Sequence, residues 1–295
     1  MAGPAATSVG IIGVGRMGAA MARRLGSRHD VLGYDVCPRP DVEIEMVTAP
    51  ALLAERCDVL LLVLPSPRET RDVFADPAFR AAFQAGHAVA FDMSTSDPAS
   101  LEALANELGE AGVRLLDAPV LGRPDRCGAW TIPVGGDEAA LERARGVLEA
   151  LAARVEHLGP RGSAHTLKLL NNLMFAAINV VSAEVIGACE MLGLPAQRFV
   201  DVVASSQAAT VSPLFRDLAP RMVVGGGETV FTVDLLAKDL QLAVRMCEDA
   251  GASLVSSRAS QIVVAQALRR GLGPADSAAL VRCFRAAEIE AGTRT

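Results

Sequence analysis

Residues 9–18 read Val9-Gly10-Ile11-Ile12-Gly13-Val14-Gly15-Arg16-Met17-Gly18, and this stretch decides the fold. The apolar residues at its start predict a buried strand, and a helical pattern covers 17–25. Gly13, Gly15 and Gly18 lie between them at the spacing GxGxxG. The first glycine permits a tight turn, the second lets a ligand approach the backbone, and the third lets the helix pack closely on the strand.

Short apolar runs alternate with helical patterns through the first half of the chain, as a doubly wound parallel sheet requires. Predicted helices include 17–25 and 98–108. The predicted strands are 9–12, 30–34, 58–64, 88–92, 113–117, 131–134 and 155–158. The sequence therefore predicts an α/β fold in this half.

From residue 163 onward the strand patterns stop. A long apolar helical segment over 168–192 is closed by Gly193 and Pro195. Further helices are predicted over 196–205, 235–249, 252–269 and 275–287. We therefore expect two domains, 1–162 with the parallel sheet and 163–295 made of helices alone.

Composition and charge exclude several classes of protein. Hydrophobic residues make up 51% of the 295 residues and charged residues 21%, which predicts a chain that folds throughout. The net charge of -6 gives no basic field for nucleic acid or an anionic membrane. No continuous apolar run reaches the roughly 20 residues that span a bilayer, and residues 1–8 lack a signal peptide's basic and apolar regions. We predict a cytoplasmic protein.

The six cysteines are scattered, with no CxxC pair and no histidine at zinc spacing. This pattern predicts free thiols in a reducing compartment and no metal site.

The end of the second predicted strand adds weight to the glycine motif. Asp35 follows Gly13 at the separation where an acid accepts hydrogen bonds from both ribose hydroxyls of a dinucleotide. The pyrophosphate would then lie at the N-terminus of the helix that the glycines open. An acid there repels a 2′-phosphate, so NAD is the predicted cofactor. Asp35 also fits a turn before Pro38, and Arg39 nearby keeps NADP open.

An ordered set of motifs, covering nearly the whole chain, resembles the beta-hydroxyacid dehydrogenases. This family contains 3-hydroxyisobutyrate dehydrogenase and is related to 6-phosphogluconate dehydrogenase. The motifs are Gly13-Val14-Gly15-Arg16-Met17-Gly18, Leu64-Pro65, Asp92-Met93-Ser94-Thr95, Asp117-Ala118-Pro119-Val120, Lys168 with Asn171 and Asn172, and Lys238-Asp239-Leu240.

The resemblance implies a Rossmann-type doubly wound sheet followed by an all-helical C-terminal domain, with a substrate cleft between them. It also implies a homo-oligomer, which we expect to be a dimer or tetramer. By the same resemblance Lys168 is catalytic and Asn172 holds the substrate. Together, the glycine motif, the acid after the second strand and the resemblance predict these cofactor-binding residues: Gly13, Gly15, Arg16, Met17, Gly18, Asp35, Leu64, Pro65, Thr95 and Lys238.

Apart from the resemblance, the residues themselves single out Lys168. It interrupts an apolar helix, and Asn172 lies one turn further on the same face. Partial desolvation favours the neutral amine, which takes the hydroxyl proton during alcohol oxidation and returns it during reduction. Alternatively, Lys168 extends to the surface. His165 lies three residues earlier, but a proton relay through it is not favoured. Lys238 and Asp239 also fit a solvated helical pair.

One loop departs from the family pattern. Family members follow the proline-valine pair with a serine and two glycines that bind the substrate carboxylate, whereas this chain has Leu121, Gly122, Arg123 and Pro124. We expect Leu121, Gly122 and Arg123 to contact the substrate, because a guanidinium holds a carboxylate, sulfonate or phosphate. Arg123 and Arg126 fit an exposed loop equally well. Trp130 is expected to pack on the sheet.

The predicted function is NAD-dependent hydride transfer between the nicotinamide and a small, anionic beta-hydroxy acid or its semialdehyde or keto form. Three alternatives stay open. Arg123 fits a reductase of a sulfonated or otherwise anionic short aldehyde, similar to the sulfolactaldehyde reductases. Imine reductases share the architecture, although they generally lack the lysine. A dinucleotide-binding protein without turnover shares the glycine loop.

Overall fold

The computed structural model describes residues 7–37, 42–206 and 212–285. The chain forms two compact units, Met1–Lys168 and Leu169–Thr295. Helix α7 (Ser163–Met191) begins in the first unit and continues in the second. The boundary predicted after residue 162 coincides with the start of this helix, whereas the compact units divide within its second turn.

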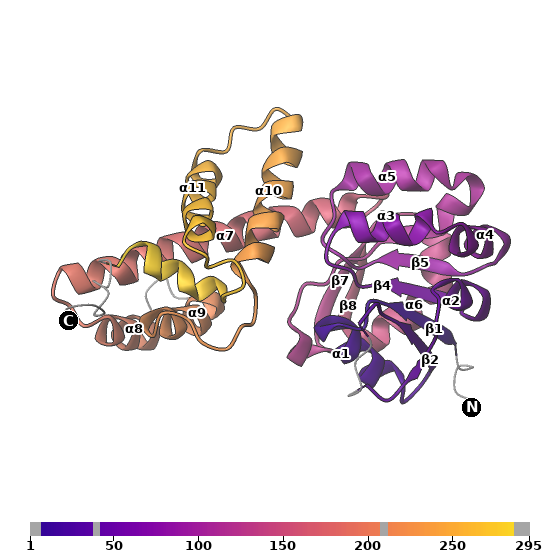
Figure 1. Ribbon diagram of the computed structural model, residues 1–295, viewed down its shortest axis with the longest axis horizontal. Coiled ribbons are helices and arrows are strands. Elements are labelled where there is room, and N and C mark those ends of the chain that lie inside the picture. The colour runs from indigo at the N-terminus through magenta and orange to yellow at the C-terminus, as the bar shows by residue number, and fades with distance from the viewer. Residues whose placement is uncertain (1–6, 38–41, 207–211, 286–295) are drawn as a thin grey trace, which may run out of the picture. The chain divides into compact units, whose positions relative to one another are not determined.

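The first unit is built on a parallel sheet of six strands in the order β3-β2-β1-β4-β5-β6 (Figure 1). This is the strand order of the dinucleotide-binding Rossmann fold, so the predicted fold class is confirmed. In register, Val9 lies opposite Val31 on one side and Val59 on the other. The strands are β1 (Ser8–Ile12), β2 (Asp30–Tyr34), β3 (Glu45–Met46), β4 (Val59–Leu62), β5 (Val89–Asp92) and β6 (Leu115–Asp117).

Helices cover both faces of this sheet (Figure 1). Alternate residues of each strand point to opposite faces. Val9 and Ile11 therefore share a core with helices α1 (Arg16–Leu25) and α6 (Glu138–Leu151). On the other face, Ile12 and Leu60 pack in the core formed with four further helices. These are α2 (Ala51–Arg56), α3 (Pro67–Ala75), α4 (Pro77–Ala85) and α5 (Pro98–Glu107).

A second, two-stranded parallel sheet pairs β7 (Trp130–Val134) with β8 (Ala152–His157). Two predicted strands are shorter than expected. The strand predicted over 58–64 ends at Leu62, before Pro65, and residues Gly109–Arg114 form a 3-10 helix ahead of β6. Gly112 in that turn packs so closely that an added Cβ would lie 2.1 Å from the carbonyl oxygen of Ala105.

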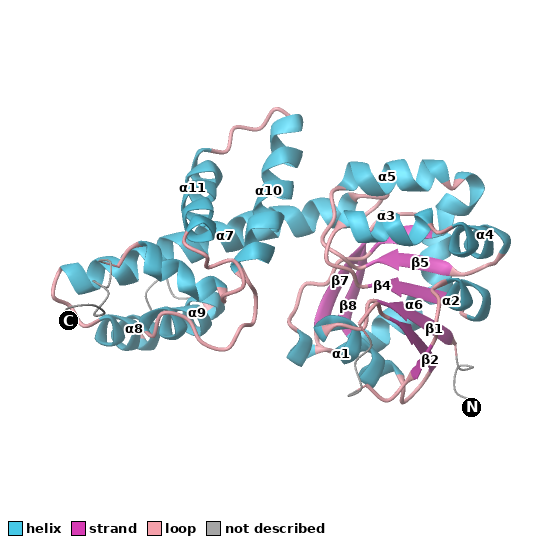
Figure 2. Ribbon diagram, viewed as in Figure 1, coloured by secondary structure: helices cyan, strands magenta, loops and turns pink. Residues whose placement is uncertain are grey.

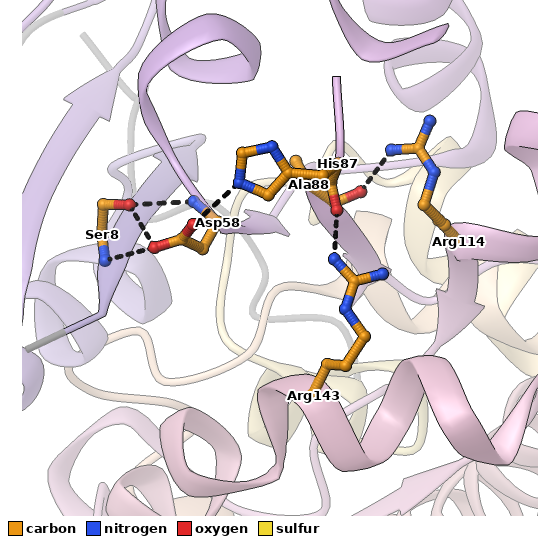
Figure 3. A network of polar contacts seen from close by, with 6 residues as sticks. All are labelled: Ser8, Asp58, His87, Ala88, Arg114 and Arg143. Carbon is orange, nitrogen blue, oxygen red and sulfur yellow. Dashed lines mark hydrogen bonds and ion pairs between the residues drawn. The ribbon is translucent and has the colours of Figure 1, made fainter. Parts of the chain in front are cut away.

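The amino ends of three strands are tied together by a polar network (Figure 3). One carboxylate oxygen of Asp58 accepts hydrogen bonds from the backbone N–H and the hydroxyl of Ser8, at 3.1 and 2.6 Å. The other lies 2.9 Å from Nε2 of His87. The bonds from Ser8, then that from His87, hold the pKa of Asp58 below its ordinary value. Arg143 and Arg114 donate to the carbonyl groups of residues 87 and 88.

The second unit is helical (Figure 2). Besides α7 it contains α8 (Ala196–Ser205), α9 (Pro213–Val223), α10 (Val233–Asp249), α11 (Val255–Arg269) and a 3-10 helix over Ser277–Cys283. Across the described parts of 163–285, strand-like pairing is limited to one bridge between Thr232 and Asp276. Helix α9 was not predicted. The helix predicted over 275–287 is the 3-10 helix, and residues 286–287 lie outside the described residues.

Helix α7 corrects one expectation about the membrane. The segment Ser163–Cys189 has a mean hydropathy of 1.6. By length and composition alone, it is long and apolar enough to cross a bilayer. Lys168 and Asn172 interrupt this segment, so it contains no continuous apolar run of the length that spans a bilayer. Half of the segment is buried inside the protein, and its buried side contributes to the core of the second unit. These are the properties of a core helix.

Candidate functional site

The glycine turn between β1 and α1 has the geometry of a dinucleotide cradle. Gly13 has φ +95°, and an added Cβ would lie 2.3 Å from the carbonyl oxygen of Val63. At Gly18 a Cβ would lie 2.1 Å from the carbonyl oxygen of Gly13, so helix and strand pack too closely for any side chain. Gly15 is the N-cap of α1, and a Cβ there would meet nothing within 4 Å. Open space over an uncapped helix N-terminus fits a pyrophosphate.

Asp35 follows β2 and contacts the glycine turn directly. Its Oδ2 accepts a hydrogen bond of 2.7 Å from the N–H of Val14, and its Oδ1 accepts one of 2.8 Å from the N–H of Cys37. Asp35 therefore fixes the turn after β2 as well as the glycine loop. A carboxylate has about four lone-pair sites, so acceptor capacity remains for ribose hydroxyls. Arg39 lies outside the described residues.

The other predicted cofactor residues of the first unit lie at the same edge of the sheet. In a parallel sheet all carboxyl ends meet at one edge, where ligands of this fold class bind. Leu64 and Pro65 follow β4, and Thr95 follows β5. The N–H of Leu64 donates to the hydroxyl of Ser94 at 3.2 Å, so these two loops lie side by side. Arg16 and Met17 form the first turn of α1, with Arg16 exposed and Met17 half-buried.

The loop after β6 is fixed by Trp130. Leu121 pairs with Thr131 through a backbone hydrogen bond of 2.9 Å. The indole Nε1 of Trp130 donates to the carbonyl oxygen of Arg123 at 2.7 Å, and a Cβ on Gly122 would lie 2.1 Å from its Cδ1. Trp130 is fully buried and belongs to the core on one face of the sheet, which agrees with the prediction that it packs there. The Arg123 side chain is half-buried, whereas that of Arg126 is 77% exposed, which makes Arg123 the better anion-binding candidate.

Asp117, at the end of β6, caps the N-terminus of α7. Its Oδ1 accepts from the N–H of Gly162 at 2.8 Å and its Oδ2 from the N–H of His165 at 2.9 Å. The carboxylate is completely buried and satisfies two donors that a helix N-terminus leaves unpaired. Further along the helix, Nζ of Lys168 donates to the carbonyl oxygen of Val120 at 2.8 Å. The amine therefore lies at the carboxyl edge of the sheet.

His165 lies on the first turn of α7 and is fully buried. Its Nε2 is 3.8 Å from Oδ2 of Asp92, which is also buried at the end of β5. This histidine therefore faces the interior of the first unit.

In the second unit, Asn172 is held by Asp239. The Nδ2 group of Asn172 donates to Oδ2 of Asp239 at 2.6 Å. Nζ of Lys238 lies 3.0 Å from Oδ1 of the same carboxylate. Asp239 is only 3% exposed, so the alternative of a solvated Lys238–Asp239 pair is wrong. The sequence carried a signal for Asp239, because it shares the buried side of α10 with Leu236.

Comparison with known proteins covers both units. The family model for the NAD binding domain of 6-phosphogluconate dehydrogenase matches residues 8–159. A second, described as NAD-binding of NADP-dependent 3-hydroxyisobutyrate dehydrogenase, matches residues 162–284. The chain is 30% identical to L-threonate dehydrogenase of Cupriavidus necator, over 96% of this chain and 97% of that protein.

It is also 28% identical to 3-sulfolactaldehyde reductase of Escherichia coli, over 94% of this chain and 96% of that one. A solved structure, 3-hydroxyisobutyrate dehydrogenase from Salmonella typhimurium, matches with a TM-score of 0.83 at 25% identity, covering 94% of this chain and 99% of that chain. The two family models together match both units, and the fold agrees with the solved structure. The chain therefore belongs to the beta-hydroxyacid dehydrogenase family of NAD(P)-dependent oxidoreductases.

Proposed function

We propose that this protein transfers a hydride between NAD and a small beta-hydroxy acid or its semialdehyde or keto form, with Lys168 as the general acid and base. The observation that carries the proposal is the hydrogen bond of 2.8 Å from Nζ of Lys168 to the carbonyl oxygen of Val120. It holds a partly buried amine at the edge of the sheet where the glycine turn and Asp35 lie.

The composition of the chain supports an amine-specific role. Among 28 basic residues, Lys168 and Lys238 are the only lysines, so the remaining 26 (28 less 2) are arginines. Arginine stays charged at all physiological pH values, whereas lysine exchanges a proton readily once it is partly buried. A chain that uses arginine almost everywhere else has lysine at two of the positions predicted to serve the reaction.

The chemistry divides between the cofactor and the chain. When bound, the nicotinamide supplies or accepts the hydride. In oxidation the neutral amine of Lys168 accepts the proton of the substrate hydroxyl, and in reduction the ammonium donates it to the new alkoxide. The carbonyl of Val120 orients the amine. Asp239 fixes the amide of Asn172, whose second N–H is then available to a substrate oxygen.

A screen of short hydroxy acids, semialdehydes and sulfonates tests this proposal with wild type and Lys168→Ala. The variant should lose about 10²-fold or more in kcat, the usual contribution of general acid–base catalysis. NADH binding, measured by energy transfer from Trp130, should be unchanged. A nearly unchanged rate would remove Lys168 from the mechanism. NADH binding without turnover on any substrate would favour a protein that binds the dinucleotide without catalysis.

The two lysines also allow a direct measurement. Selective ¹³C labelling of lysine should give two side-chain signals, and Lys238→Arg identifies them by removing one. If Lys168 is the acid–base group, its signal should titrate with the same midpoint as kcat/KM. A Lys168 signal that does not change across the pH range of the activity profile would contradict the role.

We propose NAD as the preferred cofactor because Asp35 keeps acceptor capacity beside the glycine turn and repels a 2′-phosphate. Kinetics with both cofactors test this preference.

We also propose a cytoplasmic homo-oligomer, a dimer or tetramer. Self-association is supported by exposed apolar residues along α7, namely Leu170, Met174, Val181 and Val185. Light scattering measures the oligomeric state.

A sulfonated or otherwise anionic aldehyde is the second candidate substrate. Its support is the loop that Trp130 fixes, since Arg123 stands where the family has its acid-binding serine and glycines. Arg123→Ala should raise KM for anionic substrates at least 10-fold, with kcat less affected, because a charge-assisted contact contributes about 1.5–3 kcal/mol. The control is Arg126→Ala, which removes an exposed guanidinium from the same loop. Unchanged KM values in Arg123→Ala would refute the anion contact.

A further inference from the structure

A small cavity lies in the first unit between α3, the end of β5 and α5. Its polar lining includes Thr70 of α3, Asp92 of β5 and Ser96 from the loop before α5. Leu101 and Leu104 of α5 supply part of the apolar wall. The space open to the centre of a water molecule is about 10 Å³, which is close to the minimum for one water and too small for a metabolite.

Three oxygen atoms in this lining are buried without a hydrogen-bond partner in the described part of the chain, and the His165 Nε2 that lies 3.8 Å from the Asp92 oxygen is beyond hydrogen-bond distance. They are Oγ1 of Thr70, Oδ2 of Asp92 and Oγ of Ser96. The residues are 2%, 1% and 2% exposed. Buried polar groups are almost always hydrogen-bonded, because losing contact with water without a replacement is costly. Three such atoms around one cavity of this size indicate a shared ligand.

We propose that Thr70, Asp92 and Ser96 bind one internal water molecule. The water donates a hydrogen bond to the carboxylate of Asp92 and a second to the hydroxyl of Ser96, and it accepts one from the hydroxyl of Thr70. Three bonds are the usual number for a buried water. The other carboxylate oxygen of Asp92 already accepts a hydrogen bond of 3.0 Å from the N–H of Ser94. With the water bound, both oxygens of this carboxylate have a hydrogen-bond donor.

The water joins three segments that lie next to predicted cofactor residues. Leu64 and Pro65 precede α3, separated from it by its N-cap Ser66, and Asp92 and Ser96 flank the segment that contains Thr95. Arg71 of α3 also pairs with Glu107 of α5 at 3.0 Å, which ties the same two helices together at the surface. The internal water therefore stiffens the frame that holds both loops. It goes beyond the proposed activity and does not depend on it.

A crystal structure of the wild type at about 1.5 Å resolution tests the site directly. We expect density for one water within hydrogen-bond distance of the Thr70 hydroxyl, the Asp92 carboxylate and the Ser96 hydroxyl. An empty cavity overturns the proposal.

Thermal unfolding of two Thr70 variants gives an independent test, because the sign of the change differs between a hydrated and a dry cavity. Thr70→Val keeps the shape but removes a hydroxyl. If a water is bound, the water loses a partner and Tm should fall by about 2–4 °C. If the cavity is dry, the substitution removes an unpaired buried hydroxyl, so Tm should rise, and that result overturns the proposal. Thr70→Ser, which keeps the hydroxyl, should retain the water density.

Discussion

Replacing Asp117 should destabilise the first unit more than any surface change, because one buried carboxylate caps α7 from the end of β6. Its two oxygens accept the N–H groups of Gly162 and His165 at 2.8 and 2.9 Å. A buried donor left without an acceptor costs about 1–3 kcal/mol. Loss of the negative charge at a helix N-terminus adds about 0.3–1 kcal/mol. Asp117→Ala should therefore lower the free energy of unfolding by about 3 kcal/mol or more.

Asp117→Asn is the matched variant. Its amide oxygen satisfies one of the two N–H groups, while its own NH₂ group faces the other donor. The expected loss is about half that of the alanine variant, or roughly 1.5 kcal/mol. Urea unfolding followed by Trp130 fluorescence measures both, because the single tryptophan is buried in β7 of the same unit. A loss below about 1 kcal/mol in Asp117→Ala would refute the capping role.

The cap should also affect catalysis, because Lys168 lies in the second turn of the helix that Asp117 fixes. Small displacements of a catalytic group are costly, and 1 Å can reduce a rate by about 10²-fold. We expect Asp117→Asn to lower kcat at least 10-fold while NADH binding changes little, since the glycine turn keeps its own contacts. An Asp117→Asn enzyme with wild-type kcat would show that the position of Lys168 does not depend on the cap.

Two further predictions concern the glycine turn and the pH dependence of stability. Gly15→Ala should leave Tm unchanged, because the added Cβ meets no atom within 4 Å, but it should weaken NADH binding at least 10-fold. Gly18→Ala should lower both Tm and the affinity for NADH, because its Cβ would lie 2.1 Å from the Gly13 carbonyl oxygen. Wild-type NADH affinity in Gly15→Ala would contradict the cradle. The pKa of Asp58 is lowered in the folded state, so its stabilisation is present above about pH 4 and is lost as pH falls through the folded pKa. Asp58 is 48% exposed, so Asp58→Asn should cost at most about 1 kcal/mol at pH 7, and the difference should vanish towards pH 2; a constant difference would contradict this assignment.

Local patterns were sufficient to predict most of the fold. The strand predicted over 30–34 matches β2, because buried parallel strands are short apolar runs with sharp ends. Strand β3 was not predicted, since its two residues, Glu45 and Met46, form an edge without an apolar run. Helix α9 was not predicted because Pro220 lies inside it, although Ser212 and Pro213 provide a cap and a first-turn proline.

The residues of the candidate site could likewise be predicted only in part. Gly13 and Asp35 were predictable because each directly follows a strand, and parallel topology brings such positions together. The hydrogen-bond partners of Asp117 and Asp239 lie 48 and 67 positions away, so these contacts could not be predicted from a local pattern, although the buried side of α10 gave a signal for Asp239 itself. The Val120 carbonyl that holds Lys168 is a backbone group, so its role could not be read from residue type.

The network of Ser8, Asp58 and His87 lies at the amino edge of the sheet, and the glycine turn, Asp35 and the Lys168 amine lie at its carboxyl edge. The carboxyl edge therefore combines the groups of the proposed reaction with the Asp117 cap of α7, whereas the polar network of the amino edge joins the starts of three strands. Substitutions at the amino edge can therefore be made without touching the groups of the proposed reaction, whereas a redesign of the carboxyl edge for a new substrate has to keep Asp117.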